Sequence, residues 1–142
     1  MKSLWILLRI AVLAAVAMLS ACAMQKPGEA EIPEGAQVTH RAVLIGESNH
    51  DARGTISLYQ NEREGVIVFE PNFRLEAPAG AVIAFGQNGY KAKARIAELV
   101  RNAGRQSYLV PPDLPIARYN EVWLWHEQSA RPLGLGRLTP IT

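Results

Sequence analysis

Short runs of apolar residues, several of them alternating with polar ones, follow one another along the chain beyond about residue 40. In residues 55–59, Ile56 and Leu58 occupy every second position, which is the period of a strand with one buried face. Further apolar or strand-like runs occupy residues 66–69, 81–85, 106–110 and 122–125. The pattern predicts several short strands rather than long helices.

Turn-forming residues separate these runs. Residues 61–65 join two of them at hairpin length, residues 77–80 separate the next pair, and the Asn-Gly pair in residues 87–89 follows another run. Only residues 92–100 have a helical composition, and the glycine and strand-like run after them leave a helix little room. We therefore expect an all-β antiparallel meander that forms a β-sandwich or barrel.

The N-terminus has the three-part layout of an export signal. Lys2 provides a positive start, residues 10–19 are apolar, and small residues follow. The segment Leu19-Ser20-Ala21-Cys22 resembles the lipobox of bacterial lipoproteins. That resemblance implies cleavage between Ala21 and Cys22, with a diglyceride and fatty acyl chains such as palmitate attached at Cys22. The alternative is an uncleaved membrane anchor, since residues 4–23 approach the ~20 residues that span a bilayer.

The predicted signal peptide covers residues 1–21 and leaves a lipidated N-terminus and flexible tether over residues 22–39. Prolines, glycines and acidic residues dominate the tether and offer little to bury. Residues 40–142 form the predicted β-domain. Ala23 stands where an aspartate commonly retains lipoproteins in the inner membrane, which favours the periplasmic face of the outer membrane.

Charge and cysteine content exclude several functions. Two of the fifteen basic residues, Lys2 and Arg9, lie in the leader, and the remaining thirteen balance thirteen acidic residues. A neutral domain without a basic cluster lacks the electrostatic footprint of nucleic-acid binding. The one cysteine, Cys22, forms no intramolecular disulfide, and its acylation would leave no free thiol for redox chemistry.

Several motifs resemble the DM-thirteen domain, a small all-β family often found beside the cytochrome-like DOMON domain. The most specific is the segment Asn102-Ala103-Gly104-Arg105-Gln106-Ser107-Tyr108-Leu109-Val110-Pro111, which is similar to the family pattern Asn-x-Gly-x-Gln-x-Tyr-x-Val-Pro. Other similar segments occupy residues 50–56, 69–74, 119–125 and 133–138. The resemblance implies an accessory electron-transfer role.

This chain departs from the family at two positions. His126 follows Trp125 where the family usually has a cysteine associated with electron transfer, and Ala79 replaces the aspartate of a Gly-Pro-Asp turn. An imidazole at residue 126 could bind a metal or haem, with His50 as the natural second ligand. The alternative is a structural histidine that fills the space of the cysteine and forms a hydrogen bond.

The aromatic residues provide a second candidate site. Tyr108, Tyr119, Trp123 and Trp125 could form an aromatic binding surface, or they could belong to the core. No catalytic triad spacing, phosphate-binding loop or His-x-x-x-His motif occurs. We therefore predict no enzymatic activity and no cofactor, with a bound metal or haem as the alternative.

Three functions remain open at the level of the sequence. The first is a membrane-tethered envelope lipoprotein whose β-module binds a partner protein or a small ligand. The second is an accessory electron-transfer domain, as the family resemblance implies. The third is a structural lipoprotein of the envelope. We favour the binding module.

Overall fold

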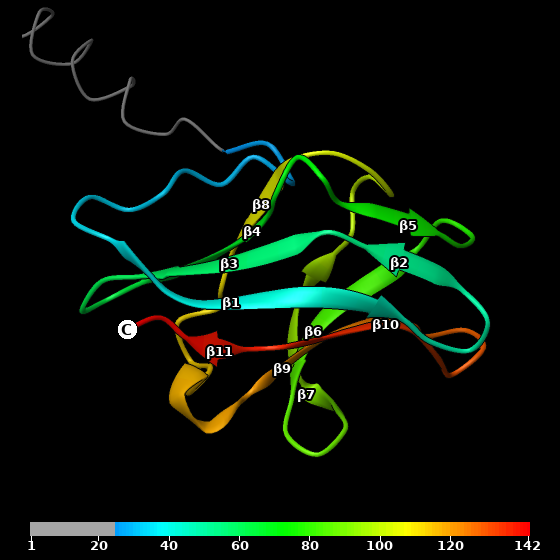
Figure 1. The fold of residues 1–142 in the computed structure, drawn as a ribbon. Coiled ribbons are helices and arrows are strands. Elements are labelled where there is room, and N and C mark those ends of the chain that lie inside the picture. The colour runs from blue at the N-terminus through cyan, green and yellow to red at the C-terminus, as the bar shows by residue number, and fades with distance from the viewer. Residues whose placement is uncertain (1–24) are drawn as a thin grey trace, which may run out of the picture.

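The computed structural model describes residues 25–142, and nearly all of the regular structure in this range is β-strand (Figure 1). Within it, no helix has the length and apolar character needed to cross a membrane. The elements are β1 (Gln37–Gly46), β2 (Asp51–Arg53), β3 (Thr55–Gln60), β4 (Gly65–Phe69), β5 (Arg74–Glu76), β6 (Ala81–Gly86), β7 (Tyr90–Glu98), β8 (Gln106–Leu109), the 3₁₀ turn η1 (Ile116–Arg118), β9 (Glu121–His126), β10 (Arg131–Arg137) and β11 (Thr139–Pro140).

One antiparallel sheet dominates the fold and nearly closes on itself. Its strand order is β7-β6-β9-β10-β1-β3-β4-β8, with β11 paired to β1, while β2 and β5 form a small separate sheet. The two ends meet where the backbone N–H of Val100, just after β7, donates to the hydroxyl of Tyr108 on β8 at 2.9 Å. The predicted all-β sandwich or barrel is confirmed. The predicted meander is wrong, because β9 inserts between β6 and β10, and β1 between β10 and β3.

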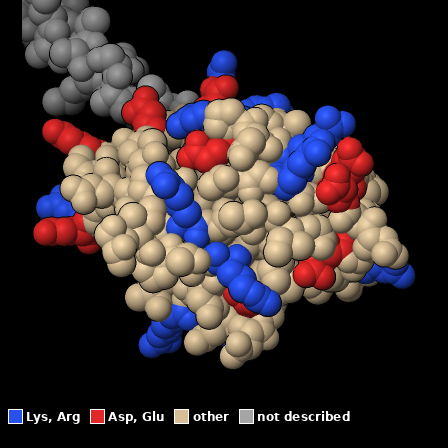
Figure 2. Space-filling model, viewed as in Figure 1, with Lys and Arg blue, Asp and Glu red and all other residues tan. Residues whose placement is uncertain are grey.

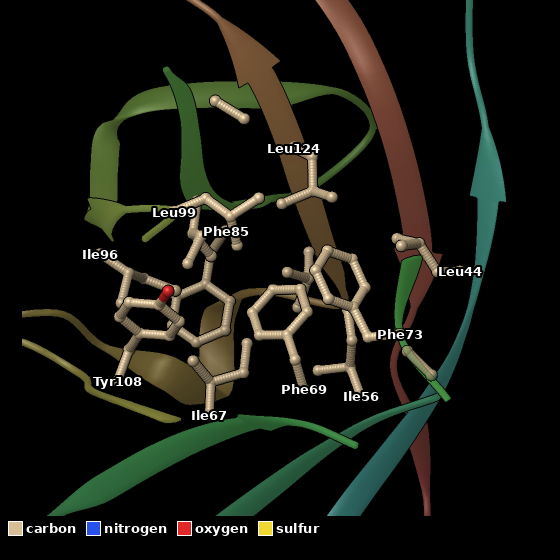
Figure 3. Packing of buried hydrophobic residues seen from close by; sticks show 14 of the residues in the cluster. Leu44, Ile56, Ile67, Phe69, Phe73, Phe85, Ile96, Leu99, Tyr108 and Leu124 are labelled. Carbon is tan, nitrogen blue, oxygen red and sulfur yellow. The ribbon is translucent and has the colours of Figure 1, made fainter. Parts of the chain in front are cut away.

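The inner side of the curved sheet holds one hydrophobic core (Figure 3). Phe69 lies at its centre, with its ring 4.7 Å from Phe73 and 5.9 Å from Tyr108, both in edge-to-face geometry. Figure 3 shows the side chains converging from strands on opposite sides of the interior. Each fully buried aromatic side chain contributes roughly 1.5–3 kcal/mol through the hydrophobic effect. The residues of the core cluster therefore lie on the inner side of the sheet.

Strand β7 replaces the helix that residues 92–100 could have formed. Its alanines and lysines favour helix locally, but they alternate with a period of two. Ala94 and Ile96 are buried, whereas Lys93 and Arg95 are exposed, and the strand pairs with β6. Packing against the core therefore overrides the local helical preference.

The predicted flexible tether over residues 22–39 is largely part of the fold. Strand β1 begins at Gln37 rather than at residue 40, and residues 28–36, which we call the strap, are bonded to the sheet. The backbone N–H of Ser107 donates to the carbonyl oxygen of Gly28 at 2.9 Å, and the backbone N–H of Ala30 donates to the carbonyl oxygen of Ser107 at 3.2 Å. The strap thus adds a short parallel segment to the free edge of β8 and covers its unpaired backbone groups.

Further along, the strap crosses towards the β3–β4 turn. There the side-chain amide of Asn61 donates to the carbonyl of Glu34 at 3.2 Å. Between these contacts lies β4, whose Val66 and Val68 are fully buried although they do not belong to the core cluster. Prolines and glycines therefore did not indicate flexibility here, because the backbone of the strap finds hydrogen-bond partners on the sheet.

Candidate binding face

Strand β9 directs two tryptophans to the outer side of the sheet. Trp123 and Trp125 are half-buried, and they alternate with Val122 and Leu124, which are fully buried in the core. Tyr90, at the start of β7, stacks on Trp125 with ring centroids 4.2 Å apart and planes 2° from parallel. The Trp123 and Trp125 rings lie 6.4 Å apart at 80° to one another. We call Tyr90, Trp123 and Trp125 the aromatic corner.

Small residues on the neighbouring strand make room for this corner. Ala84 and Gly86 of β6 lie opposite Trp123 and Glu121 in the antiparallel ladder. A β-carbon at Gly86 would lie 2.4 Å from Nε1 of Trp123, far inside van der Waals contact. The absence of a side chain at Gly86 therefore allows the indole to lie directly over β6.

A nearly buried carboxylate borders the corner on the Trp123 side. Oε1 of Glu121 accepts the backbone N–H of Gly89 at 2.8 Å and Nε1–H of Trp123 at 3.4 Å. Oε2 lies 3.8 Å from Nη1 of Arg137, which is longer than a hydrogen bond. The Arg137 side chain is 72 % exposed, against 9 % for Glu121. Carboxylate and guanidinium therefore both have bonding capacity left beside the indole.

A second ion pair borders the corner on the Tyr90 side. Nε of Arg95 donates to Oε1 of Glu127 at 3.1 Å. Burial against the neighbouring residues raises the pKa of Tyr90, the Glu127 carboxylate raises it further, and Arg95 opposes them. The Tyr90 hydroxyl therefore stays protonated, and each border of the corner carries one positive and one negative group.

Aliphatic side chains extend this outer face towards β1. Leu135 of β10 lies opposite Trp123, and Ile45 of β1 lies opposite Leu135. Ile45 is 64 % exposed and Val43 is 70 % exposed. Figure 2 shows uncharged surface together with scattered basic and acidic side chains on the side of the molecule that β1 and β10 form. An apolar band therefore runs from β1 to the aromatic corner.

The two predicted histidines each contact their own turn. His126 is half-buried at the end of β9, where its Nδ1 lies 2.6 Å from Oγ of Ser129 and accepts the Ser129 backbone N–H at 3.3 Å. His50 lies in the turn between β1 and β2, where its backbone N–H donates to Glu47 at 3.0 Å. Within residues 25–142, no group of three or more His, Cys, Asp or Glu side chains is placed to hold a metal.

The four aromatic residues predicted to form a binding surface lie in different environments. Tyr108 is buried in the core rather than on a surface, since its hydroxyl donates to Gln106 and accepts the Val100 N–H. Tyr119 stacks on the core residue Phe85 at 5.5 Å. Of the four, Trp123 and Trp125 belong to the aromatic corner. Tyr90 was not among the predicted site residues, because the Asn-Gly turn before it predicts only a reversal of the chain and not the contact with Trp125.

The predicted cleavage and lipidation residues, Ala21 and Cys22, lie outside the described residues. Comparisons of the chain with protein-family models, with curated proteins and with solved structures find no match. The candidate site therefore rests on its own geometry.

Proposed function

We propose that this protein is a lipid-anchored protein of the bacterial envelope whose β-domain binds another molecule and catalyses no reaction. The observation that carries this proposal is the apolar band between Val43 and the aromatic corner. None of these side chains belongs to the core cluster, and all except the buried Leu135 are half-buried or exposed. Contiguous apolar surface of this kind on a small domain marks an interaction site.

The composition of the band also supports binding. Tryptophan, tyrosine and arginine are the residues that contribute most to binding energy at interfaces. Here Trp123, Trp125 and Tyr90 lie between Arg137 and Arg95. Strand pairing fixes the backbone of these three residues, and the ion pairs fix the charged side chains beside them. The site is therefore ordered before a ligand binds, which lowers the entropic cost of binding.

The anchor rests on the lipobox-like segment that ends at Cys22. Two or more acyl chains hold a protein stably in a bilayer, whereas one chain binds only marginally. Ala23 favours the outer membrane, with the domain on its periplasmic face. The proposed protein is thus a binding module held at a membrane surface.

The anchor is tested with Cys22→Ser in cells given a fatty-acid probe. Serine cannot form the thioether, so we expect the variant to stay unlabelled and to leave the membrane fraction or remain uncleaved. Incorporation of label and membrane fractionation equal to those of the parent would refute the anchor.

The binding role is tested with the chain from residue 23 on, which retains every strand described above. We expect it to bind isolated envelope fractions saturably, and Ile45→Glu to weaken binding at least tenfold, or about 1.4 kcal/mol. Leu109→Glu is the matched control, because Leu109 is a similarly sized, 47 % exposed residue on β8, away from the band. Equal binding by both variants, or no saturable binding by the parent, would refute the role.

A further inference from the structure

We infer that the aromatic corner, with Glu121 and Arg137, binds an N-acetylated amino sugar within a glycan chain. This inference rests on the proposed function, because it names the ligand class of the same face. It follows from three features: the ring geometry, the unused polar groups beside the rings, and the balance of charge around them.

The ring geometry suits a sugar ring. The C–H face of a pyranose and the methyl of an acetamido group are weakly positive and pack on the negative face of an aromatic ring. Trp123 and Trp125, at 80° to one another, form the two sides of a corner rather than one flat surface. Tyr90 covers one face of Trp125, so a sugar ring would stack on the other face of Trp125 or on Trp123, with its edge or acetyl methyl against the second indole.

The polar groups suit an acetamido substituent. A carboxylate accepts the amide N–H, and a guanidinium donates to the amide carbonyl. Oε2 of Glu121 and Nη1 of Arg137 lie 3.8 Å apart, so neither is consumed by a direct hydrogen bond to the other. The hydrogen bond from the Gly89 N–H to Oε1 of Glu121 preorganises the carboxylate beside the Trp123 indole.

The charge balance favours a neutral ligand. One border of the corner carries Glu121 and Arg137, and the other carries Arg95 and Glu127. Neither a polyanion nor a polycation gains net attraction from such borders. An uncharged, hydroxyl-rich ligand meets both a donor and an acceptor on each side.

The sequence provides a direct probe of this site. The chain contains three tryptophans, Trp5 in the leader and Trp123 and Trp125 in the corner. In the chain from residue 23 on, tryptophan fluorescence therefore reports the corner alone. The experiment titrates this chain with chitohexaose, a β-1,4-linked hexamer of N-acetylglucosamine, and with cellohexaose, which has the same linkage without acetamido groups.

We expect a saturable fluorescence change with chitohexaose at a dissociation constant on the order of 0.1–1 mM, and at least tenfold weaker binding of cellohexaose. Arg137→Gln should weaken chitohexaose binding about fivefold or more, since it removes the guanidinium donors. Arg131→Gln, an exposed arginine at the other end of β10, is the matched control and should bind as the parent does. Far-ultraviolet circular dichroism verifies that both variants fold.

Three outcomes would overturn the inference: no saturable change with chitohexaose, equal affinity for cellohexaose, or equal weakening by the two arginine variants. The proposed function is judged separately. Saturable, Ile45-dependent binding to envelope fractions without binding to chitohexaose would support the binding module and overturn only the glycan as its ligand. Absence of both kinds of binding would overturn the inference and the proposed function together.

Discussion

Trp123 of β9 lies over Gly86 of β6 so closely that a β-carbon on the glycine would fall 2.4 Å from the indole nitrogen and 2.4 Å from the carbonyl of Gly89. Gly86→Ala should therefore displace the indole or the β6–β7 turn and cost about 1–3 kcal/mol of unfolding free energy. Urea denaturation measures the loss, and a shift of tryptophan emission reports the moved ring. Gly134→Ala, where the nearest atom would lie 3.3 Å away, should cost less. Equal losses would show that Gly86 does not position Trp123.

The strap should depend on Ser107. Ser107 is buried, with 1 % of the residue exposed, and its hydroxyl donates to the carbonyl of Ala30 at 2.6 Å. Ser107→Ala removes this donor and should lower the unfolding free energy by about 0.5–1.5 kcal/mol. Limited proteolysis followed by mass spectrometry should then show faster cleavage within residues 25–36. If the parent loses these residues as fast as the variant does, the strap is not part of the stable fold.

Alkaline pH should destabilise the protein partly through Tyr108. Burial raises the pKa of Tyr108, while the Val100 N–H and Arg101 oppose this more weakly. Stability from the protonated phenol is therefore fully present below the unfolded pKa of about 10 and is lost as pH rises through the folded pKa. Tyr108→Phe should be less stable near pH 7 by about 0.5–1.5 kcal/mol, with a shallower alkaline decline. Thermal melts across pH 7 to 11 should show this difference, and parallel curves would refute it.

His126 should stabilise the turn that follows β9 through its contact with Ser129. His126→Ala and Ser129→Ala each break the same side-chain contact, so each should cost about 0.5–1.5 kcal/mol. Their double variant should cost less than the sum, because the two residues share that interaction. Copper or zinc should raise the melting temperature of the parent no more than that of His126→Ala. A saturable, His126-dependent stabilisation by copper, zinc or haem would instead favour the electron-transfer hypothesis.

Local features of the fold could be predicted from the sequence. Residues 61–64 join β3 to β4, one residue fewer than predicted because Gly65 already belongs to β4. The Asn-Gly turn joins β6 to β7, with positive φ at Asn88 and Gly89. Such turns depend on a few neighbouring residues. The order of strands could not be predicted, because the pairing of β9 with β6 and of β1 with β10 joins segments far apart in the chain.

The candidate site was predictable only in part, for a related reason. The alternation of residues 122–125 indicates that two side chains face one way and two the other, but not which side is inner. Trp123 and Trp125 lie outside because Val122 and Leu124 fill the core. Tyr90 joins them only through pairing across β6, and the Glu121 contact with Gly89 likewise spans two strands. Contacts between side chains on different strands depend on the tertiary fold, so the pattern of neighbouring residues in the sequence does not predict them.

If Cys22 carries the proposed lipid, the strap limits how far the domain extends from the membrane. Gly28, the first strap residue bonded to the sheet, follows Cys22 by only six positions. Fully extended, this stretch spans about 20 Å, whereas a free tether to residue 40 would span about three times as much. With a lipid on Cys22, the domain would be confined to the layer directly above the bilayer. The domain could then bind only ligands that are present close to the membrane surface.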